Sequence, residues 1–405
     1  MSSAAEPRPR IRDSVRAFPR ATWILFAGTF VHRLASFVFP FLALYLTRRG
    51  LTVGQAGLAL TGYGLGGVAA QLAGGLLTDR IGRRNAIALS MIASAILVLT
   101  VLQARSTIAV VAVVIPYAFF AELHRPASYA LLADLTPPEH RLAAIALYRL
   151  LVNLAFAIGL AVGGILAARS FTLLFVIDAA SSAVFGVISL LVLPHGTKTS
   201  KSEERALGGG ARAAILADTG FLRVLAAIFA SALVYAQTYS TFPLWVRDLG
   251  FDEQVYGFLQ ATNGFLIVAF ELAVTAIALR HTRTRMIALG VLLTGLGFGS
   301  FAVFTSATGM FMAVVVWSFG EMFDSPSAAA FTADRAPLHA RGRYQSALGI
   351  TYGLAFTLGP LLGTALYRVS PEGVWGACVV LGAIGALLAL RAERDLTPGA
   401  EGRID

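Results

Sequence analysis

Ionisable side chains lie inside long apolar stretches of this 405-residue chain, where an isolated charge is costly. Such groups usually face a cavity or a partner of opposite charge, and they bind ligands, carry protons or form structural ion pairs. Their presence predicts that the protein binds a ligand and transfers protons. Nothing in the sequence indicates enzyme chemistry. The full set is Arg33, Glu122, His124, Arg125, Arg149, Asp178, Glu271, Glu321 and Asp324.

Two of the acids are three residues apart, Glu321 and Asp324, so they share one face of a helix. Repulsion between neighbouring carboxylates allows one of them to bind a proton near neutral pH. We therefore predict that they are proton sites, and Glu271 is a third candidate. A structural role is the alternative for each of the three. Asp178 is expected to make only a local hydrogen bond.

Arg33 lies about 17 Å into the first apolar stretch at 1.5 Å per residue, near the middle of a bilayer. It is the first candidate for a residue that binds substrate or couples transport, with a structural ion pair as the alternative. Glu122 and Arg149 are expected to contact each other or to share a network with Arg125. Asn153 lies one helical turn from Arg149 and can extend that network.

Aromatic and polar residues in the same stretches are further candidates to face a substrate, although aromatic residues in spans more often serve packing or anchor the helix at the interface. Tyr235, Gln237 and Tyr239 lie in the seventh stretch. Tyr117, Phe120, Trp317, Tyr344 and Tyr352 complete this set.

The composition places these residues in a membrane protein, because 57% of the chain is hydrophobic and only 13% is charged. Soluble domains carry about 25% charged residues. Apolar runs of about 20 residues, each enough to cross a bilayer as a helix, recur along the chain. The sequence predicts an all-α protein with twelve transmembrane helices. The runs are 22–46, 54–78, 85–104, 107–131, 142–168, 171–193, 221–246, 254–279, 286–305, 307–331, 342–367 and 373–391.

The longest polar stretch between runs divides the spans into six and six. The predicted parts are an N-terminal tail (1–21), a six-helix bundle (22–193), a linker (194–220), a second six-helix bundle (221–391) and a C-terminal tail (392–405). The two halves match at an offset of 200 residues: Pro126 with Pro326, Asp134 with Asp334, and Gly57 with Gly257. This indicates a duplicated unit. Parallel repeats place a substrate site at their interface, near the midplane.

The formal net charge is +10, and the positions of the Lys and Arg residues suggest why the chain is so basic. Most of the 32 Lys and Arg residues fall in the tails, the linker and the connections on the same side as the linker. That asymmetry follows the positive-inside rule, so we expect both termini in the cytoplasm and the protein in the plasma (inner) membrane. Arginines of the N-terminal tail are expected to contact anionic headgroups. We expect a monomer with no nucleic-acid partner, no metal and no cofactor other than protons.

The short connection after the second run carries an unusual group of charges. Its residues Gly75, Asp79, Arg80, Gly82, Arg83 and Arg84 match the Gly-x-x-x-Asp-Arg-x-Gly-Arg-Arg signature of the major facilitator superfamily. With its twelve spans, central linker and repeat, the chain resembles that superfamily, and particularly its drug–proton antiporter branch. The resemblance implies a cytoplasmic latch in which Asp79 bridges to the start of span eleven, near Arg341. Arg83 would join this charge network.

One part of the sequence departs from the antiporter pattern. Antiporters in this superfamily often carry Gly-x-x-x-Gly-Pro-x-x-Gly-Gly in span five, whereas this chain has Ala155, Gly159, Leu160, Gly163 and Gly164. The expected function is proton-coupled export of small amphipathic molecules by alternating access. The alternatives are a proton-coupled importer, a lipid-type flippase, and a membrane sensor that has the fold but transports nothing.

Overall fold

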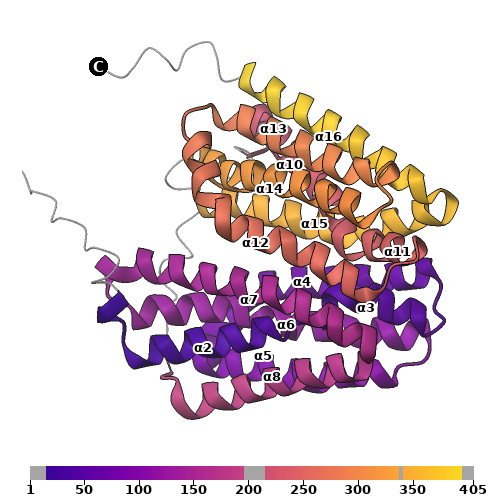
Figure 1. Cartoon of the computed structure of the whole chain (residues 1–405). Helices are drawn as coiled ribbons and strands as arrows, with labels where there is room; N and C mark the ends of the chain where they lie inside the picture. Colours follow the sequence, from indigo (N-terminus) through magenta and orange to yellow (C-terminus); the bar gives the residue numbers. More distant parts are fainter. Residues whose placement is uncertain (1–14, 196–214, 337–340, 395–405) are drawn as a thin grey trace, which may run out of the picture.

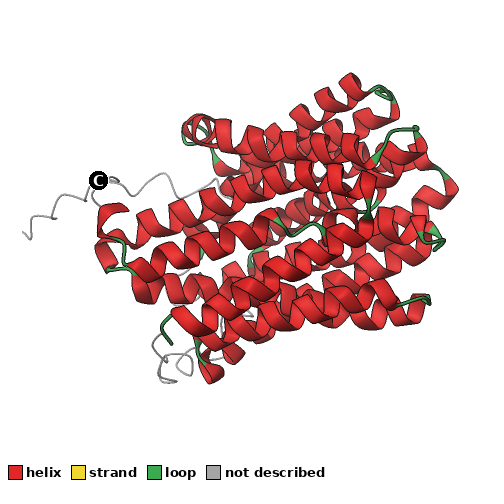
Figure 2. Ribbon diagram, turned by 60° about the horizontal axis from the view of Figure 1, so that its bottom comes forward, coloured by secondary structure: helices red, strands yellow, loops and turns green. Residues whose placement is uncertain are grey.

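The computed structural model describes residues 15–195, 215–336 and 341–394, and within these ranges it contains helices and short connections but no strand (Figure 2). Figure 1 shows two groups of helices, one formed by the N-terminal half and one by the C-terminal half. The first group contains α2 (Arg20–Leu34), α3 (Val38–Arg48), α4 (Val53–Ile81), α5 (Arg83–Gln103), α6 (Thr107–Leu135), α7 (Arg141–Arg169) and α8 (Phe171–Val192). The second contains α10 (Thr219–Tyr235), α11 (Thr241–Asp248), α12 (Glu253–Ala278), α13 (Arg283–Gly299), α14 (Ala307–Arg335), α15 (Arg341–Val369) and α16 (Pro371–Arg394).

Ten helical segments of the described chain are long and apolar enough to cross a membrane. Helices α4 and α14 are 29 residues long but fall outside this set. The mean hydropathy of α4 is lowered by its many glycines, and that of α14 by Glu321 and Asp324. The arrangement is an all-α, multi-pass membrane fold, with which twelve spans are compatible.

The first and seventh predicted spans are not continuous helices, contrary to expectation. The first is interrupted between Leu34 and Val38. The seventh passes through a short 3₁₀ helix, η3 (Ala236–Tyr239), before α11 begins. The two interruptions lie at equivalent places in the repeat, so both halves have irregular backbone at the same depth. Irregular backbone at membrane depth occurs where it is buried in protein or lines a cavity.

The two bundles touch along two equivalent helix pairs, α4 with α15 and α7 with α12. Gly257 of α12 lies so close to α7 that a Cβ there would be 2.6 Å from the carbonyl oxygen of Leu160 and 2.7 Å from the Cα of Gly164. On the other side, Gly57 packs directly against Thr364. Both contacts obey the offset of 200 residues, and small residues allow such close helix crossings.

The ends of the bundles differ in how closely the two halves approach. We call the end that carries His195 and Thr219, where the linker leaves and returns, the linker end. At the opposite end Arg48 lies 2.9 Å from Glu253, and Arg247 donates a 2.8 Å hydrogen bond to Thr47. The phenol of Tyr256 donates to the carbonyl of Pro40 at 3.1 Å. The bundles are therefore joined at the opposite end.

Contacts between α4 and α15 weaken toward the linker end. A Cβ on Gly353 would meet Val68 at 2.7 Å, and one on Gly349 would meet Gln71 only at 3.9 Å. Nothing in the described chain lies within 4 Å of the corresponding point on Gly75, one turn further. The two helices thus diverge as they approach the linker end.

Candidate functional site

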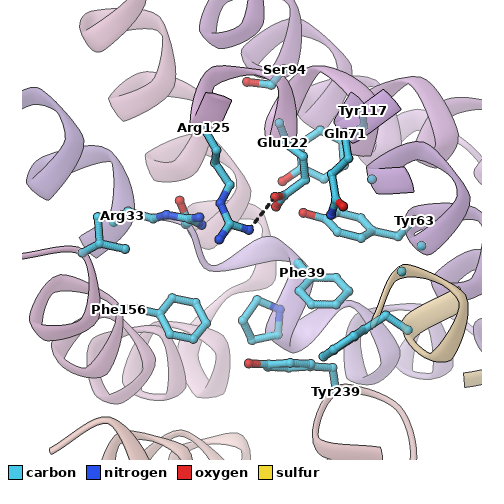
Figure 3. A pocket seen from close by; sticks show the side chains of 18 of the residues that line it. Arg33, Phe39, Tyr63, Gln71, Ser94, Tyr117, Glu122, Arg125, Phe156 and Tyr239 are labelled. Atoms are coloured by element: carbon cyan, nitrogen blue, oxygen red, sulfur yellow. Dashed lines mark hydrogen bonds and ion pairs between the residues drawn. The ribbon is translucent and has the colours of Figure 1, made fainter. Parts of the chain in front are cut away.

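A cavity of about 580 Å³ lies between the two bundles. Its walls come from α2 to α8 on one side and from α10, η3 and α15 on the other. This volume is in the range of pockets that hold drug-sized ligands. Figure 3 shows its charged and aromatic side chains facing one another across the open space. The interruptions of the first and seventh spans border the cavity through Ser36 and Tyr239.

Charged side chains of α2 and α6 occupy the N-terminal wall. Arg125 donates a hydrogen bond to Glu122 at 2.9 Å, one helical turn away (Figure 3). Arg33 also lines the cavity, but it forms no hydrogen bond or ion pair with any residue that the structure describes. The wall therefore contains one paired cation and one cation without an acidic partner among the described residues.

The expected Glu122–Arg149 contact is absent from the described chain, and this part of the prediction is wrong. Glu122 is engaged by Arg125. Arg149 instead lies 3.9 Å from Glu271 of α12, so it reaches across to the other bundle rather than to α6. The reason is the position of Arg149 on the face of α7 that packs on α12. Asn153, one turn along α7, lines the cavity.

Asp178 of α8 supports the interruption in the first span. Its carboxylate accepts a 3.2 Å hydrogen bond from the backbone N–H of Val38, the first residue of α3. The prediction of a purely local hydrogen bond was wrong, because the broken helix exposes N–H groups that need an acceptor. The neighbouring Ser182 hydroxyl lies 3.2 Å from Nδ1 of His32, and the Nε2 of the same ring lies 3.4 Å from the Ser36 hydroxyl. Buried polar groups thus hold α8 against the break.

We predict that Asp178→Ala lowers the free energy of unfolding by about 1–2 kcal/mol, the usual cost of losing an N-cap acceptor. Asp178→Asn should retain most of this stability, since an amide oxygen can accept the same N–H. Thermal unfolding of the purified protein in detergent would measure both. Equal losses in the two variants would show that the negative charge, and not the acceptor, supports α3.

The acids of α14 lie in a smaller adjoining pocket of about 220 Å³ within the C-terminal bundle. Glu321 accepts a hydrogen bond from Asn263 at 3.0 Å, and Asp324 accepts one from Ser231 at 2.5 Å. All of the donors recorded for these two carboxylates in the described chain are neutral. The side chain of Asp324 is buried, with the residue only 6% exposed. Each of these acids is hydrogen-bonded, and neither is paired with a cation in the described residues.

Aromatic side chains form a continuous wall across both bundles. Phe39 stacks on Tyr63 with ring centroids 4.1 Å apart, and it also contacts Tyr239 at 4.8 Å. Tyr239 meets Tyr235 at 6.4 Å, and Tyr235 meets Phe356 at 6.0 Å. All five line the cavity. The wall therefore offers aromatic surface, with rings at differing tilts, from α3 and α4 to α10 and α15.

Some aromatic residues of the cavity were identified by the sequence reasoning, and others were missed. Tyr117, Tyr235, Tyr239 and Tyr352 line the cavity as candidates, whereas Trp317 is fully buried and Tyr344 is buried against Phe221. The missed lining residues include Phe39, Tyr63, Gln71, Phe156 and Phe356. Several of them could have been found from the repeat, because aromatic residues occur at equivalent positions in the two halves. Phe39 and Tyr239 are separated by 200 residues, and so are Phe156 and Phe356.

The charged connection between α4 and α5 turns at Gly82, whose φ of +87° favours glycine. Arg83 then lies 2.7 Å from Asp134, and the repeat places Arg283 3.6 Å from Asp334. Arg84 approaches His195 at 2.6 Å. The same ion pair thus occurs in both halves.

The other residues of the predicted latch do not form a bridge within the described chain. Gly75, Asp79 and Arg80 are exposed. Asp79 has no hydrogen bond or ion pair with a described residue. The side chain of Arg341, its expected neighbour, lies outside the description. The divergence of α4 and α15 at this end separates the helices that the latch would join.

Two bundles of membrane helices around a shared central cavity define the architecture of a transporter. The Major Facilitator Superfamily model matches residues 25–252 and 224–404, and the chain belongs to this superfamily. The predicted resemblance is confirmed, and the protein is of a transporter family rather than an enzyme family.

Relatives and solved structures agree with this assignment. The chain is 26% identical to the MFS-type transporter YqjV of Bacillus subtilis, over 84% of this chain and 85% of YqjV. It is also 26% identical to a Na(+), Li(+), K(+)/H(+) antiporter of Planococcus maritimus, over 80% of this chain and 84% of the antiporter. Its fold is similar to that of a point mutant of the nucleoside transporter NupG, with a TM-score of 0.79 and 14% identity over 93% of this chain and all of NupG.

Proposed function

We propose that the protein exports small amphipathic molecules in exchange for protons, by alternating access of the central cavity. The observation that carries this proposal is the pair of acids, Glu321 and Asp324, which lie beside the cavity and are held by neutral donors. Burying an unpaired carboxylate in low-dielectric surroundings is costly, and binding a proton removes that cost. A proton-binding group beside a ligand cavity is the arrangement that exchange requires. The antiporter relative supports the same mechanism.

In the proposed cycle the bundles rock against each other, and the close crossings at Gly57 and Gly257 separate when the opposite end opens. In the conformation described here the opposite end is joined, and α4 and α15 diverge at the linker end. Substrate enters the cavity from the linker end. Protonation of Glu321 or Asp324 then accompanies the return of the empty transporter. Formation of the Asp79 bridge to the start of α15 would close the linker end in the outward-facing state.

We further propose that the linker end and both termini face the cytoplasm of the cell, with the protein in the plasma membrane. The basic residues concentrated at this end support that orientation. We propose that it acts as a monomer surrounded by anionic lipids. With this orientation, the described conformation is inward-facing.

The experiment that tests proton exchange uses the purified full chain in proteoliposomes that are acidic inside and contain a pH-sensitive dye. A panel of fluorescent amphipathic compounds is added outside. Uptake should be accompanied by internal alkalinisation, and both should stop when nigericin and potassium collapse the pH gradient. Uptake that is unaffected by nigericin would contradict proton coupling. Uptake that requires protons on the same side as the compound would indicate an importer.

We predict that Glu321→Gln and Asp324→Asn each lower gradient-driven uptake to about a tenth, in the range of coupling free energies found between sites. The amides keep the hydrogen-bonding shape of the acids but cannot exchange a proton. Exchange of labelled for unlabelled compound without a gradient should continue. Glu372→Gln, an exposed residue at the start of α16, is the control. If both α14 variants accumulate compound normally, these acids are not the proton sites.

Exchange of monovalent cations for protons is a second candidate, because the Planococcus maritimus relative is named as such an antiporter. The cavity itself argues against a free cation as the substrate, since Arg33 adds a positive charge to its wall without an acidic partner in the described chain. The same vesicles decide between the two. Sodium, lithium or potassium ions added outside would release protons only if cation exchange occurs.

A further inference from the structure

The charged side chains of the cavity wall indicate which sign of ligand charge it can bind, because some of them already have partners within the protein. Glu122 is paired with Arg125 at 2.9 Å. Asp178 faces the start of α3 and accepts the N–H of Val38. The remaining charged side chain of this wall is Arg33 of α2. The N-terminal wall therefore presents a guanidinium group whose acidic partner is not among the described residues.

The shape of the cavity adds a second requirement. The guanidinium groups of Arg33 and Arg125 and the rings of Phe39, Tyr63 and Tyr239 face the same space in Figure 3. Phe39 and Tyr63 stack on each other at an interplanar angle of only 20°, so a planar ring can extend this stack or meet the ring edges. Planar aromatic groups bind such surfaces by offset stacking or edge-to-face contact.

The acids of the C-terminal bundle do not line the space that Arg33 faces. Glu321 and Asp324 lie in the smaller pocket, and they are absent from the lining of the main cavity. Tyr235, Tyr352 and Phe356 line both spaces and stand between them. An anionic group on the Arg33 side is thus separated from the two carboxyl groups by aromatic rings.

We propose that the cavity binds an amphipathic organic anion with a planar aromatic part. Its carboxylate or phosphate pairs with Arg33, and its ring lies against the wall formed by Phe39, Tyr63 and Tyr239. Guanidinium groups bind carboxylate and phosphate with two parallel hydrogen bonds, which gives both affinity and orientation. This assignment names the substrate class of the proposed exporter and rests on that proposed function.

The test compares four probes on the purified full chain in phosphatidylcholine nanodiscs, by isothermal titration calorimetry. The probes are 2-naphthoate, 2-naphthol, 2-naphthylmethylammonium and cyclohexanecarboxylate. The naphthoate should bind at least about tenfold more tightly than the ammonium compound, since an ionic hydrogen bond contributes that much. It should also bind more tightly than cyclohexanecarboxylate, which carries the charge without the aromatic ring.

Variants locate the anion. Arg33→Gln should weaken binding of 2-naphthoate by about tenfold or more and leave binding of neutral 2-naphthol unchanged. Arg33→Lys should restore part of the affinity. Arg105→Gln, an exposed arginine in the connection between α5 and α6, is the matched control. Unchanged 2-naphthol binding also shows that the variant is folded, and the ranking of the probes on the unmodified protein requires no variant.

Three results would overturn the assignment. The ammonium compound could bind more tightly than the naphthoate, or Arg33→Gln could leave naphthoate affinity unchanged. Phosphatidylglycerol added to the nanodiscs could displace the naphthoate, which would assign the anionic group to a lipid. The outcome is separate from that of the proposed function. Naphthoate that binds through Arg33 but is never moved by a pH gradient would contradict export, whereas proton-coupled flux of the ammonium compound would contradict only the anion assignment.

Discussion

Gly257→Val is expected to reduce transport by about a hundredfold while leaving each bundle folded. A Cβ at this position would lie 2.6 Å from the carbonyl oxygen of Leu160 and 2.7 Å from the Cα of Gly164, both of them backbone atoms that no rotamer change can move. The clash occurs only when the opposite end is joined, so it opposes that state selectively. A penalty of about 3 kcal/mol, within the range for overpacking, changes the population of a state by more than a hundredfold. Uptake into proteoliposomes measures the loss.

The cause of that loss can be checked without a substrate. Spin labels on Gln103→Cys, at the exposed end of α5, and on Thr305→Cys, in the exposed connection before α14, report the separation of the halves at the opposite end. The native Cys378 is buried and should remain unlabelled. The distance should increase in Gly257→Val. Gly376→Val is the control, because nothing in the described chain lies within 4 Å of a Cβ at that exposed position of α16. Normal transport by Gly257→Val would mean that this crossing need not close.

Arg83→Gln is expected to lower the free energy of unfolding by about 3–5 kcal/mol, the cost of removing one partner of a buried ion pair. The side chain of Arg83 is only 7% exposed, that of Asp134 is 18% exposed, and the two lie 2.7 Å apart. The glutamine would leave the carboxylate partly buried without this cation. Chemical denaturation in detergent micelles measures the change.

The repeat supplies a matched control for this pair within the same molecule. Arg283 and Asp334 are the equivalent residues, but their side chains are 33% and 68% exposed and lie 3.6 Å apart. Solvent screens such a pair, so Arg283→Gln should cost no more than about 1 kcal/mol. Similar losses in the two variants would show that burial does not distinguish the pairs. A large difference would show that only the N-terminal copy of the connection contributes substantially to stability.

Much of the fold could be predicted from composition and the internal repeat. Apolar runs determine where helices cross the membrane, because backbone groups in lipid must be satisfied within the helix. The interruptions after Leu34 and Tyr235 could not be predicted, since the apolar pattern continues through them. The first depends on an acceptor elsewhere in the chain, Asp178, whose role is set by packing between α8 and α3.

The sequence could predict which residues belong to the candidate site, but not which of their side chains contact each other. Spacing along a helix predicted Arg33, Glu122 and Asp324 at membrane depth, and it included Arg125 in the network, but it did not predict that Arg125 would be the partner of Glu122. The rotation of α7 determines whether Arg149 faces α6 or α12, and that rotation comes from the close helix crossings of the two bundles. The aromatic lining required comparing aromatic positions across the repeat as well as charged ones.

Tyr235, Tyr352 and Phe356 form one partition between two compartments. A ring that swings to enlarge the space on one side must reduce the space on the other. Filling either compartment therefore changes the room available in its neighbour directly, with no chain of intervening residues. Steric exclusion by these three side chains therefore opposes filling both compartments at once. The size of the side chains determines how strongly a ligand in one compartment hinders occupation of the other.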